Sequence, residues 1–337
     1  MHSVIPKAVT GRFVATALCA ALLSTSCSDD DETTNTTPAL PDTVAFTQAG
    51  LYPEGVQYDA TGRRFLVSSQ TRGAVGQVKD DGTYSQFADD PVLVSTIGMR
   101  VDEARQRLLV AVSDPGYNTA RTSTATQRKL AGLAAFNLTT GARLAYTDLG
   151  ALRPGQNHFA NDIAVDGQGN SYVTDSFSPL IYKVDAQGTA SVLLENAQLA
   201  APAGAFGLNG IVYHPDGYLL VAKSNEGAIF KIPLSNPSAF TKVTLPQALT
   251  GADGMLLQDN NTLQVVTNAQ AKVYRLSSTD GWTTATVTGT FSTPPQYPTT
   301  LARREGADSY VLYSNLNALQ ANQNPPVSVF TIARVKF

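Results

Sequence analysis

Short segments of alternating apolar and polar residues recur along most of the chain, and each is followed by a turn and a second β-rich run. Alternation with a period of two residues is typical of β-strands that bury one face. The intervening turns contain Gly, Asn or Asp, which supply the positive φ angles of tight hairpins. No sustained 3.6-residue apolar pattern is present, which disfavours βαβ folds. Six copies of the segment begin at residues 54, 97, 161, 209, 253 and 299.

A repeat of about 45 residues with four antiparallel strands predicts a β-propeller. We therefore predict an all-β protein whose residues 43–337 form six four-stranded blades. The sixth copy has only three good strands before Phe337, so we expect Thr43–Thr47 (TVAFT) to supply its outer strand. Such closure would join the two ends of the body and remove exposed sheet edges. A β-sandwich and a seven-bladed propeller are the alternatives.

Two insertions interrupt the regular spacing. Residues 114–131 lengthen the second unit, and residues 314–327 lengthen the sixth, in both cases between the second and third strands. In a propeller these connections lie at the same end as the starts of the innermost strands. Both loops could therefore overhang the channel mouth and bind a ligand, as functional loops often do. Ordinary surface decoration is the alternative.

The N-terminus has the pattern of a targeting signal. Lys7 and Arg12 precede an apolar run, residues 13–23, that is too short for an ordinary membrane span. The small residues before Cys27 resemble a bacterial lipoprotein cleavage box. This resemblance implies a signal peptide over residues 1–26, a lipid on Cys27 and a location in the cell envelope, at the cell surface, the outer membrane or the periplasmic side. Secretion without a lipid is the alternative.

The composition of the chain excludes several classes of binding partner and site. Residues 27–42 are acidic and rich in Thr, and we expect them to be a disordered tether. Residues 43–337 carry equal numbers of acidic and basic side chains, which argues against nucleic acid as a partner. The only cysteines are Cys19 and Cys27, so the body has no disulfide, no thiolate metal site and no cysteine nucleophile. We expect a soluble, monomeric body that contacts the membrane through its lipid alone.

The starts of the six segments point to a metal site. The first strand of each blade lines the channel of a propeller, so these six residues should form a ring at one end. Two carboxylates and two amides facing one axis suit a hard divalent cation, and Ca²⁺ takes 6–8 oxygen ligands. We predict one such cation, Ca²⁺ first, with Mg²⁺, Mn²⁺ or Zn²⁺ as alternatives. Reading Asn-Gly and Asp-Gly as turn dipeptides is the competing interpretation. The ring consists of Glu54, Ile97, Asn161, Asn209, Asp253 and Thr299.

Four of these segments together resemble a known family. Glu54 in YPEGV, Asn161 in ANDIAVD, Asn209 in LNGIVYHPDG and Asp253 in ADGMLL are similar to the pattern of the SMP-30/gluconolactonase/LRE-like family, over most of residues 46–337. The resemblance implies a six-bladed hydrolase of lactones or related esters with a divalent cation in its axial channel. It implies that Glu54, Asn209 and Asp253 are metal ligands, and that Asn161 is a further ligand or an amide that orients the substrate. Phe159 stands where some sugar lactonases have an arginine, which favours a more apolar substrate.

This chemistry gives each residue a predicted role. The cation would bind the carbonyl oxygen of the ester and stabilise the oxyanion. Asp253 is the candidate general base for the attacking water, and Asn161 would fix the substrate. His158 is a candidate proton shuttle, and Asp175 and Asn225 are candidate pocket residues. For these three residues a solvated loop position is the alternative.

Other functions remain open on the sequence. No G-x-S-x-G elbow is present, so a serine esterase is not supported. His214 precedes a Pro-Asp-Gly turn at the far end of its strand, and we interpret it as structural. The main rival is a non-catalytic surface propeller that binds a ligand or glycan and keeps Ca²⁺ for structure. A third reading is an NHL-like scaffold without a metal.

Overall fold

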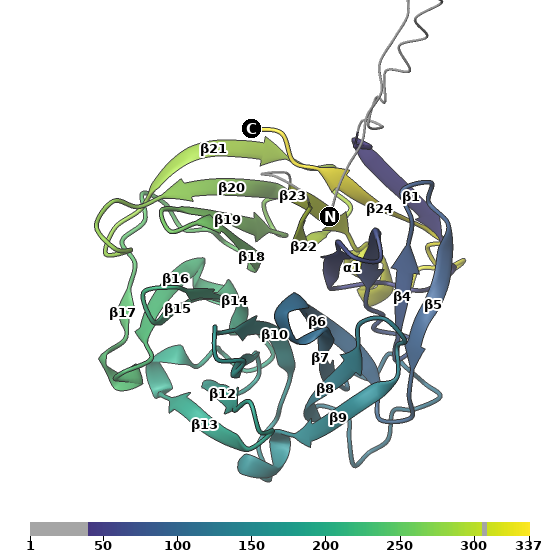
Figure 1. The fold of residues 1–337 in the computed structure, drawn as a ribbon, viewed down its shortest axis with the longest axis horizontal. Coiled ribbons are helices and arrows are strands. Elements are labelled where there is room, and N and C mark those ends of the chain that lie inside the picture. Colours follow the sequence, from purple (N-terminus) through teal and green to yellow (C-terminus); the bar gives the residue numbers. More distant parts are fainter. Residues whose placement is uncertain (1–39, 305–308) are drawn as a thin grey trace, which may run out of the picture. The chain divides into compact units, whose positions relative to one another are not determined.

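The computed structural model describes residues 40–304 and 309–337. The predicted signal peptide, Cys27 and most of the predicted tether lie outside the described residues. Residues Pro41–Phe337 form one compact unit. Six four-stranded antiparallel sheets surround a central axis in this unit (Figure 1). The predicted six-bladed propeller is thus confirmed, and neither a sandwich nor a seven-bladed ring is formed.

The strands of the first five blades follow one another from the axis to the rim in chain order. Blades one to three consist of β2 (Val56–Asp59), β3 (Arg64–Val67), β4 (Ala74–Val78) and β5 (Tyr84–Asp89); β6 (Ser95–Asp102), β7 (Arg107–Ser113), β8 (Ala131–Asn137) and β9 (Arg143–Asp148); and β10 (Ala160–Val165), β11 (Ser171–Asp175), β12 (Leu180–Val184) and β13 (Ala190–Glu195). Blades four and five consist of β14 (Leu208–His214), β15 (Tyr218–Lys223), β16 (Ala228–Pro233) and β17 (Thr241–Lys242); and β18 (Ala252–Asp259), β19 (Thr262–Thr267), β20 (Lys272–Ser277) and β21 (Thr286–Ser292).

The sixth blade is built from both ends of the body. From the axis outward it contains β22 (Pro298–Arg303), β23 (Ser309–Tyr313), β24 (Val329–Arg334) and β1 (Thr43–Thr47). The described helices are short, and none of them has the length and hydrophobicity needed to cross a membrane. They are α1 (Leu316–Gln320) and the 3₁₀ turns η1 (Glu103–Arg105), η2 (Gly150–Leu152), η3 (Ala197–Leu199), η4 (Ser224–Glu226) and η5 (Pro237–Ala239).

Strand β1 closes the ring as predicted. It pairs antiparallel with β24, from Thr43 opposite Ala333 to Thr47 opposite Val329. The closure begins slightly earlier than we placed it, since the carbonyl of Pro41 accepts a hydrogen bond from the Tyr310 hydroxyl at 2.7 Å. The carbonyl of Asp42 likewise accepts the N–H of Arg334 at 2.8 Å, so Pro41 and Asp42, which we assigned to the tether, contact the sixth blade.

The core lies between neighbouring blades. Six clusters of buried apolar side chains each combine residues of two adjacent blades. The middle strands are buried on both faces, and β7 (RLLVAVS) contains the unbroken apolar run LLVAV for this reason. The outermost β21 (TVTGTFS) alternates between exposed and half-buried positions. Aromatic contacts such as Phe65 with Tyr310, 5.3 Å between ring centroids, fasten blade one to blade six.

A β-bulge recurs at one level of the channel. In β14 the pairing with β15 passes from Leu208–Lys223 to Ile211–Val221, so one extra residue is inserted at Asn209 and Gly210. The same shift occurs at the ring position of β6, β10, β18 and β22. A bulge bends the strand and re-aims a side chain. In β10, β14 and β18 the ring residue at the bulge lines the channel cavity, whereas Ile97 in β6 packs in the apolar core between blades two and three.

The glycines that follow the ring residues are required by close packing. A Cβ on Gly210 would overlap the carbonyl oxygen of Asp253, and one on Gly254 would lie 2.7 Å from the Cα of Thr300. Neither glycine has the left-handed backbone of a tight turn, and both lie inside strands. The competing interpretation of Asn-Gly and Asp-Gly as turn dipeptides is therefore wrong. These glycines let the innermost strands approach each other around the channel.

Candidate functional site

Four polar ring residues line one cavity at the mouth of the channel. Glu54 precedes β2, while Asn161, Asn209 and Asp253 sit at the bulges of β10, β14 and β18. All four line the same cavity of about 580 Å³, and all are at least nine-tenths buried. The structure thus brings together every residue of the predicted ligand set, although they come from four different blades.

Each of these four side chains has one oxygen without a hydrogen-bond partner. The atoms are Glu54 Oε2, Asn161 Oδ1, Asn209 Oδ1 and Asp253 Oδ1. A buried polar atom without a partner costs about 1–3 kcal/mol, and more when it is charged. Four such atoms in a single cavity are a set of acceptors that lacks a common positive partner.

Two serines fix the direction of the amides. Ser176 follows β11 and accepts from Asn161 Nδ2 at 2.9 Å, while Ser224 follows β15 and accepts from Asn209 Nδ2 at 3.1 Å. Each serine hydroxyl donates its one proton to a backbone carbonyl of the next blade, that of Leu208 or Ala252. A serine can therefore only accept from its asparagine. Both amide oxygens are left facing the cavity.

Hydrogen bonds also position the two acidic residues, through the side chain of Asp253 and through the backbone of Glu54. Asp253 Oδ2 accepts from Asn268 Nδ2 at 2.9 Å, which leaves Oδ1 toward the cavity. The backbone carbonyl of Glu54 accepts from the hydroxyls of Thr299 and Thr300 at 2.7 and 2.8 Å. These bonds tie blade one to the ring position of blade six. The ring is thus positioned by neighbouring blades and not by its own strands alone.

The electrostatics of the ring favour a cation. Burial raises the pKa of Glu54 well above its ordinary value, and the charges of Asp253 and Asp162 raise it further. Burial likewise raises the pKa of Asp253 to about 7, although hydrogen bonds from Asn268 and Asn209 oppose the shift. A nearby positive charge lowers carboxyl pKa values. A divalent cation at this place would therefore reverse the shifts.

The donor set fits a hard cation. Two carboxylates and two amide oxygens are the ligands that Ca²⁺ prefers, with water completing the coordination. Among the described residues no group of three or more His, Cys, Asp or Glu side chains is placed to hold an ion. Zinc, which favours nitrogen and sulfur ligands, is therefore the poorest match among the cations considered.

His158 and Asp175 lie behind the wall of the cavity and do not line it. His158 Nδ1 is 2.7 Å from Asp175 Oδ2, and Tyr182 donates to the same oxygen at 2.9 Å. His158 Nε2 is 2.9 Å from the carbonyl of Arg153, which can only accept. Burial lowers the pKa of His158, but the hydrogen bond and charge of Asp175 raise it by more, and the net shift is upward.

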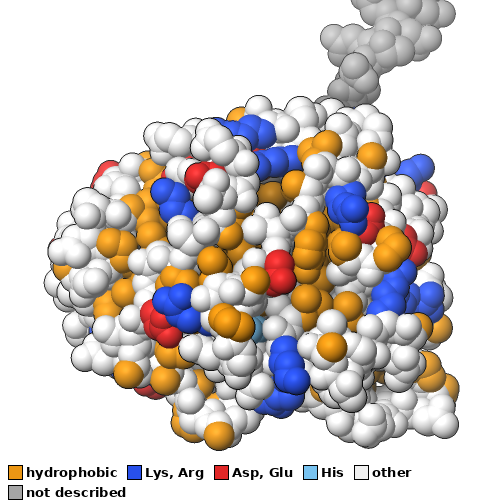
Figure 2. All heavy atoms as spheres, turned by 90° about the horizontal axis from the view of Figure 1, so that it is seen from below, with side chains coloured by type: hydrophobic (Ala, Val, Ile, Leu, Met, Phe, Trp, Pro, Cys, Tyr) orange, Lys and Arg blue, Asp and Glu red, His pale blue; other side chains and the backbone are white. Residues whose placement is uncertain are grey.

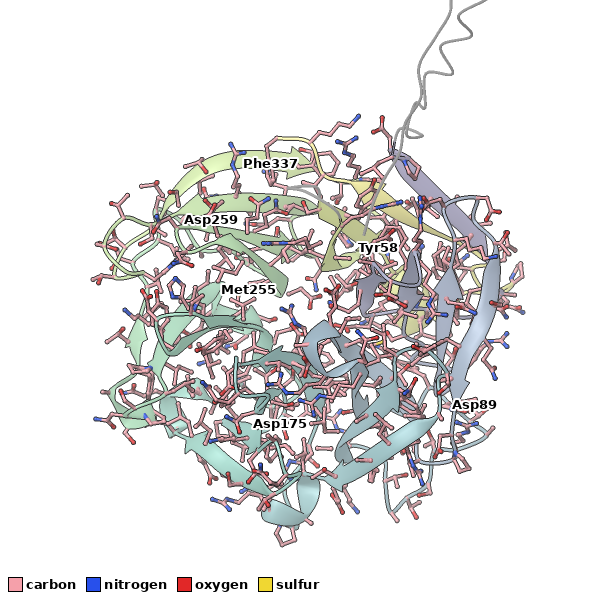
Figure 3. All side chains as sticks on the ribbon, in the orientation of Figure 1. Tyr58, Asp89, Asp175, Met255, Asp259 and Phe337 are labelled. Atoms are coloured by element: carbon pink, nitrogen blue, oxygen red, sulfur yellow. The ribbon has the colours of Figure 1, made fainter. Side chains whose placement is uncertain are left out.

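These contacts correct our prediction for two of the three pocket residues. Asp175 Oδ1 also accepts backbone N–H groups of Phe159, Phe177 and Ser178 at 2.9–3.0 Å, so its carboxylate is saturated. In Figure 3 Asp175 lies out in blade three, whereas Met255 is beside the channel. This buried pair, with its hydrogen bonds filled, organises the loop above β11 and does not face the cavity. Asn225, the third residue, does line the cavity.

One part of the cavity wall is aromatic. Phe159, Phe177 and Phe206 contact one another with ring centroids 5.2–5.3 Å apart. The guanidinium of Arg128 lies 4.5 Å from the centre of the Phe177 ring. This surface agrees with the expectation, drawn from Phe159 alone, of an apolar substrate group.

Both insertions reach the cavity, as their positions predicted. The loop between β7 and β8 contributes Pro115, Tyr117 and Arg128, and the loop between β23 and β24 contributes Leu316 and Gln320. Figure 2 shows the outer side of the molecule, seen at right angles to the view in Figure 1, where charged side chains are scattered among uncharged ones.

Sequence reasoning missed the acid at Asp162. Its carboxylate accepts the N–H groups of Ile163 at 2.8 Å and Ile211 at 3.2 Å, and burial raises its pKa to about 6. It occupies the position that is glycine after Glu54, Asn209 and Asp253. An acid in an otherwise glycine position was the signal that could have revealed it.

Comparison with known proteins identifies the fold. No family model and no curated protein matches the sequence. Among solved structures, the major allergen Mala s 1 of Malassezia sympodialis is 18% identical, with 88% of this chain and 97% of that chain covered and a TM-score of 0.71. The calcium-binding protein regucalcin of Agrobacterium tumefaciens is 16% identical over 86% and 92%, with a TM-score of 0.58. A candidate gluconolactonase is 14% identical over 87% and 92%, also with a TM-score of 0.58. The resemblance noted in the sequence thus extends to the fold.

Proposed function

We propose that this protein is a divalent-cation-dependent hydrolase of a lactone or a related carboxylic ester, with Ca²⁺ as the cation. The observation that carries the proposal is the set of four unpartnered oxygens on Glu54, Asn161, Asn209 and Asp253 in one buried cavity. The similarity in fold to a calcium-binding protein and to a candidate gluconolactonase supports it.

The four ring side chains would hold the cation. When bound, a divalent cation supplies a Lewis acid that polarises a carbonyl oxygen and stabilises the developing oxyanion. Ser176 and Ser224 keep the amide oxygens directed at the cavity. This orientation favours a ligand role for Asn161 over a role as hydrogen-bond donor to the substrate.

Asp253 is the proposed general base. Its Oδ1 faces the cavity, while Asn268 holds Oδ2 and thereby fixes the plane of the carboxylate. A base must lie within hydrogen-bond reach of the water that it deprotonates. Glu54 is the alternative acceptor, since its Oε2 also faces the cavity.

The substrate binds with its apolar part against the aromatic wall. Phe159, Phe177 and Phe206 would cover an alkyl or aryl group next to the ester and keep water from it. Asn225 offers an amide at the rim for a polar substituent. Alkyl-substituted lactones and aryl esters are therefore better expected substrates than polyhydroxylated sugar lactones.

Hydrolysis of such a panel tests the proposal. We expect turnover with Ca²⁺, its loss in excess chelator, and a fall of at least 100-fold in kcat/KM for Asp253→Asn and Glu54→Gln. The matched control is Asp216→Asn, which removes an exposed carboxylate in the turn after His214. Turnover that survives chelation would overturn the role of the cation. Stabilisation by Ca²⁺ without any turnover would instead support the non-catalytic binding propeller.

We also propose that the chain reaches the cell envelope and is held there by a lipid on Cys27. This part rests on the sequence alone: the charged start, the short apolar run and the small residues before the cysteine.

A further inference from the structure

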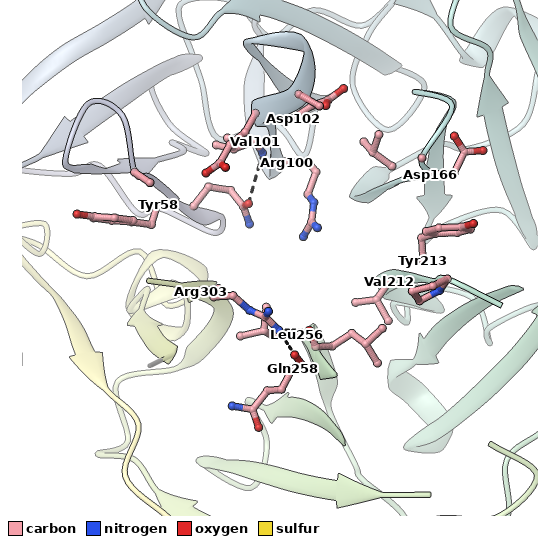
Figure 4. Close-up of a pocket in the computed structure, with 18 of the residues that line it drawn as sticks. Tyr58, Arg100, Val101, Asp102, Asp166, Val212, Tyr213, Leu256, Gln258 and Arg303 are labelled. Atoms are coloured by element: carbon pink, nitrogen blue, oxygen red, sulfur yellow. Dashed lines mark hydrogen bonds between the residues drawn. The ribbon is translucent and has the colours of Figure 1, made fainter. Parts of the chain in front are cut away.

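The channel has a second, separate cavity at its other mouth. It has a volume of about 800 Å³ and is built from the later residues of all six innermost strands (Figure 4). Arg100 follows the ring residue Ile97 by three positions, and Arg303 follows Thr299 by four. At about 3.3 Å per residue the two arginines lie roughly 10–13 Å along the strands from the ring. This cavity and the proposed cation site share no lining residue.

Two arginine side chains extend into the middle of this second cavity (Figure 4). The half-buried guanidinium of Arg100 forms no hydrogen bond or ion pair with any other described residue. Arg303 Nη2 donates to the carbonyls of Leu257 and Gln258, which fixes the guanidinium at the mouth. Its Nε and Nη1 make no hydrogen bond within the described part of the chain.

The acids near the cavity form no ion pair with these two arginines. The charge of Asp162 acts on Arg100, but its carboxylate accepts the N–H groups of Ile163 and Ile211 and forms no ion pair with Arg100 within the described part of the chain. Asp102 binds Arg105 and Arg107, at 3.3 and 2.8 Å. Asp166 accepts from Asn170 and Tyr172 at 2.7 and 2.9 Å. Both carboxylates turn away from the centre of the cavity in Figure 4.

The other charged side chains that line this cavity are either hydrogen-bonded to other residues or exposed to solvent. Arg304 forms a two-bond pair with Asp80. The carboxylate of Asp259 accepts the N–H of Asn261 in a turn, and Glu103 is exposed on η1. Arg100 and Arg303 therefore line the cavity as two cations that form no ion pair with a described acid.

The chemistry of the cavity defines the ligand. Guanidinium groups bind carboxylate and phosphate oxygens through paired, charge-assisted hydrogen bonds. The surrounding wall includes the apolar side chains of Val101, Val212 and Leu256. We propose that this mouth of the channel binds a small organic anion, with its carboxylate or phosphate between Arg100 and Arg303 and its apolar part against this wall.

Binding of hexanoate, benzoate and phenyl phosphate to the Ca²⁺-loaded protein tests the proposal by calorimetry. We expect affinity to fall at least tenfold in Arg100→Gln and in Arg303→Gln. The matched control is Arg105→Gln, which removes a charge that lines the same cavity but is already paired with Asp102. Equal affinity in all variants, or no binding of any probe at millimolar concentration, would overturn the proposal. The relative affinities for hexanoate and phenyl phosphate decide between carboxylate and phosphate as the preferred group.

A second measurement uses the wild-type protein, so the proposal can still be tested if the variants fail to fold. Phenylglyoxal modifies accessible guanidinium groups, and peptide mass spectrometry locates the modified residues. The best-bound probe should protect Arg100 and Arg303 but not the exposed Arg63. Protection of none of these residues would refute the site. Because no residue is shared with the ring, this result is independent of whether the protein hydrolyses esters.

Discussion

Replacing Asp253 by Asn should stabilise the cation-free protein and abolish its response to Ca²⁺. Without a cation, the buried carboxylates of Asp253 and Glu54 repel each other, and each is also repelled by Asp162. Asparagine has nearly the same shape and keeps an oxygen for the Nδ2 of Asn268. The substitution therefore removes the repulsion while leaving the local packing intact.

The pKa of Asp253 sets the size of this effect. It is about 7, against an ordinary value of 3.8. Each unit corresponds to about 1.4 kcal/mol, so ionised Asp253 costs at most about 4 kcal/mol of stability. Because the pKa is raised on folding, this group contributes stability below pH 4 that is lost as the pH rises through 7. At pH 8 without a cation, Asp253→Asn should gain roughly 2–4 kcal/mol, or about 3–6 °C in Tm for a body of this size.

Thermal and urea unfolding at pH 5 and pH 8, in chelator and in Ca²⁺, measure both halves of the prediction. In chelator, the wild type should lose stability between pH 5 and pH 8, and Asp253→Asn should lose less. In Ca²⁺ the wild type should overtake the variant at pH 8. A variant that is less stable than the wild type in chelator at pH 8 would refute the account of the ring as a repulsive, cation-seeking site.

Three further predictions concern other contacts. Ser224→Ala frees the amide of Asn209 to turn, so Ca²⁺ affinity measured by calorimetry should fall about tenfold, whereas the exposed Ser191→Ala should leave it unchanged. His158→Gln breaks a buried pair and should lower the free energy of unfolding by about 3 kcal/mol, most strongly at acidic pH because the raised pKa keeps the imidazole charged there; a loss of turnover at unchanged stability would restore the proton shuttle. Cys27→Ser should abolish incorporation of radiolabelled palmitate and release the protein from the membrane fraction, and continued labelling would disprove the anchor.

The fold could be predicted because short sequence patterns recur once in each blade. Alternating strands such as TVAFT and glycines such as Gly210 and Gly254 repeat with the blades, and the ring residues precede those glycines. We predicted correctly that Glu54 and Asp253 share a cavity. The sequence patterns did not reveal why the glycines are there, which is contact between strands; the turn geometry that we kept as the competing interpretation is not formed.

The rest of the site depends on contacts between blades. Nothing near Ser224 in the sequence indicates that its hydroxyl orients Asn209 and donates to the carbonyl of Ala252. His158 looked available as a lone histidine near the ring, but its saturation by Asp175 depends on how a loop folds back over β11. Arg100 lies near the end of β6. Whether its charge is paired depends on residues of the other blades that line the same cavity. Such facts follow from three-dimensional packing and leave little trace in spacing.

The pairing of β1 with β24 has a consequence for biogenesis. The first strand of the body and the last are separated by almost the whole polypeptide, yet they share one ladder of hydrogen bonds. The ring of blades cannot close until β24 has emerged from the ribosome, and such distant contacts form slowly. If the chain is exported, its propeller would thereby stay incompletely folded during synthesis. Pairing of β24 with β1 ends this open state, so a chain without β24 should be unable to complete the sixth blade.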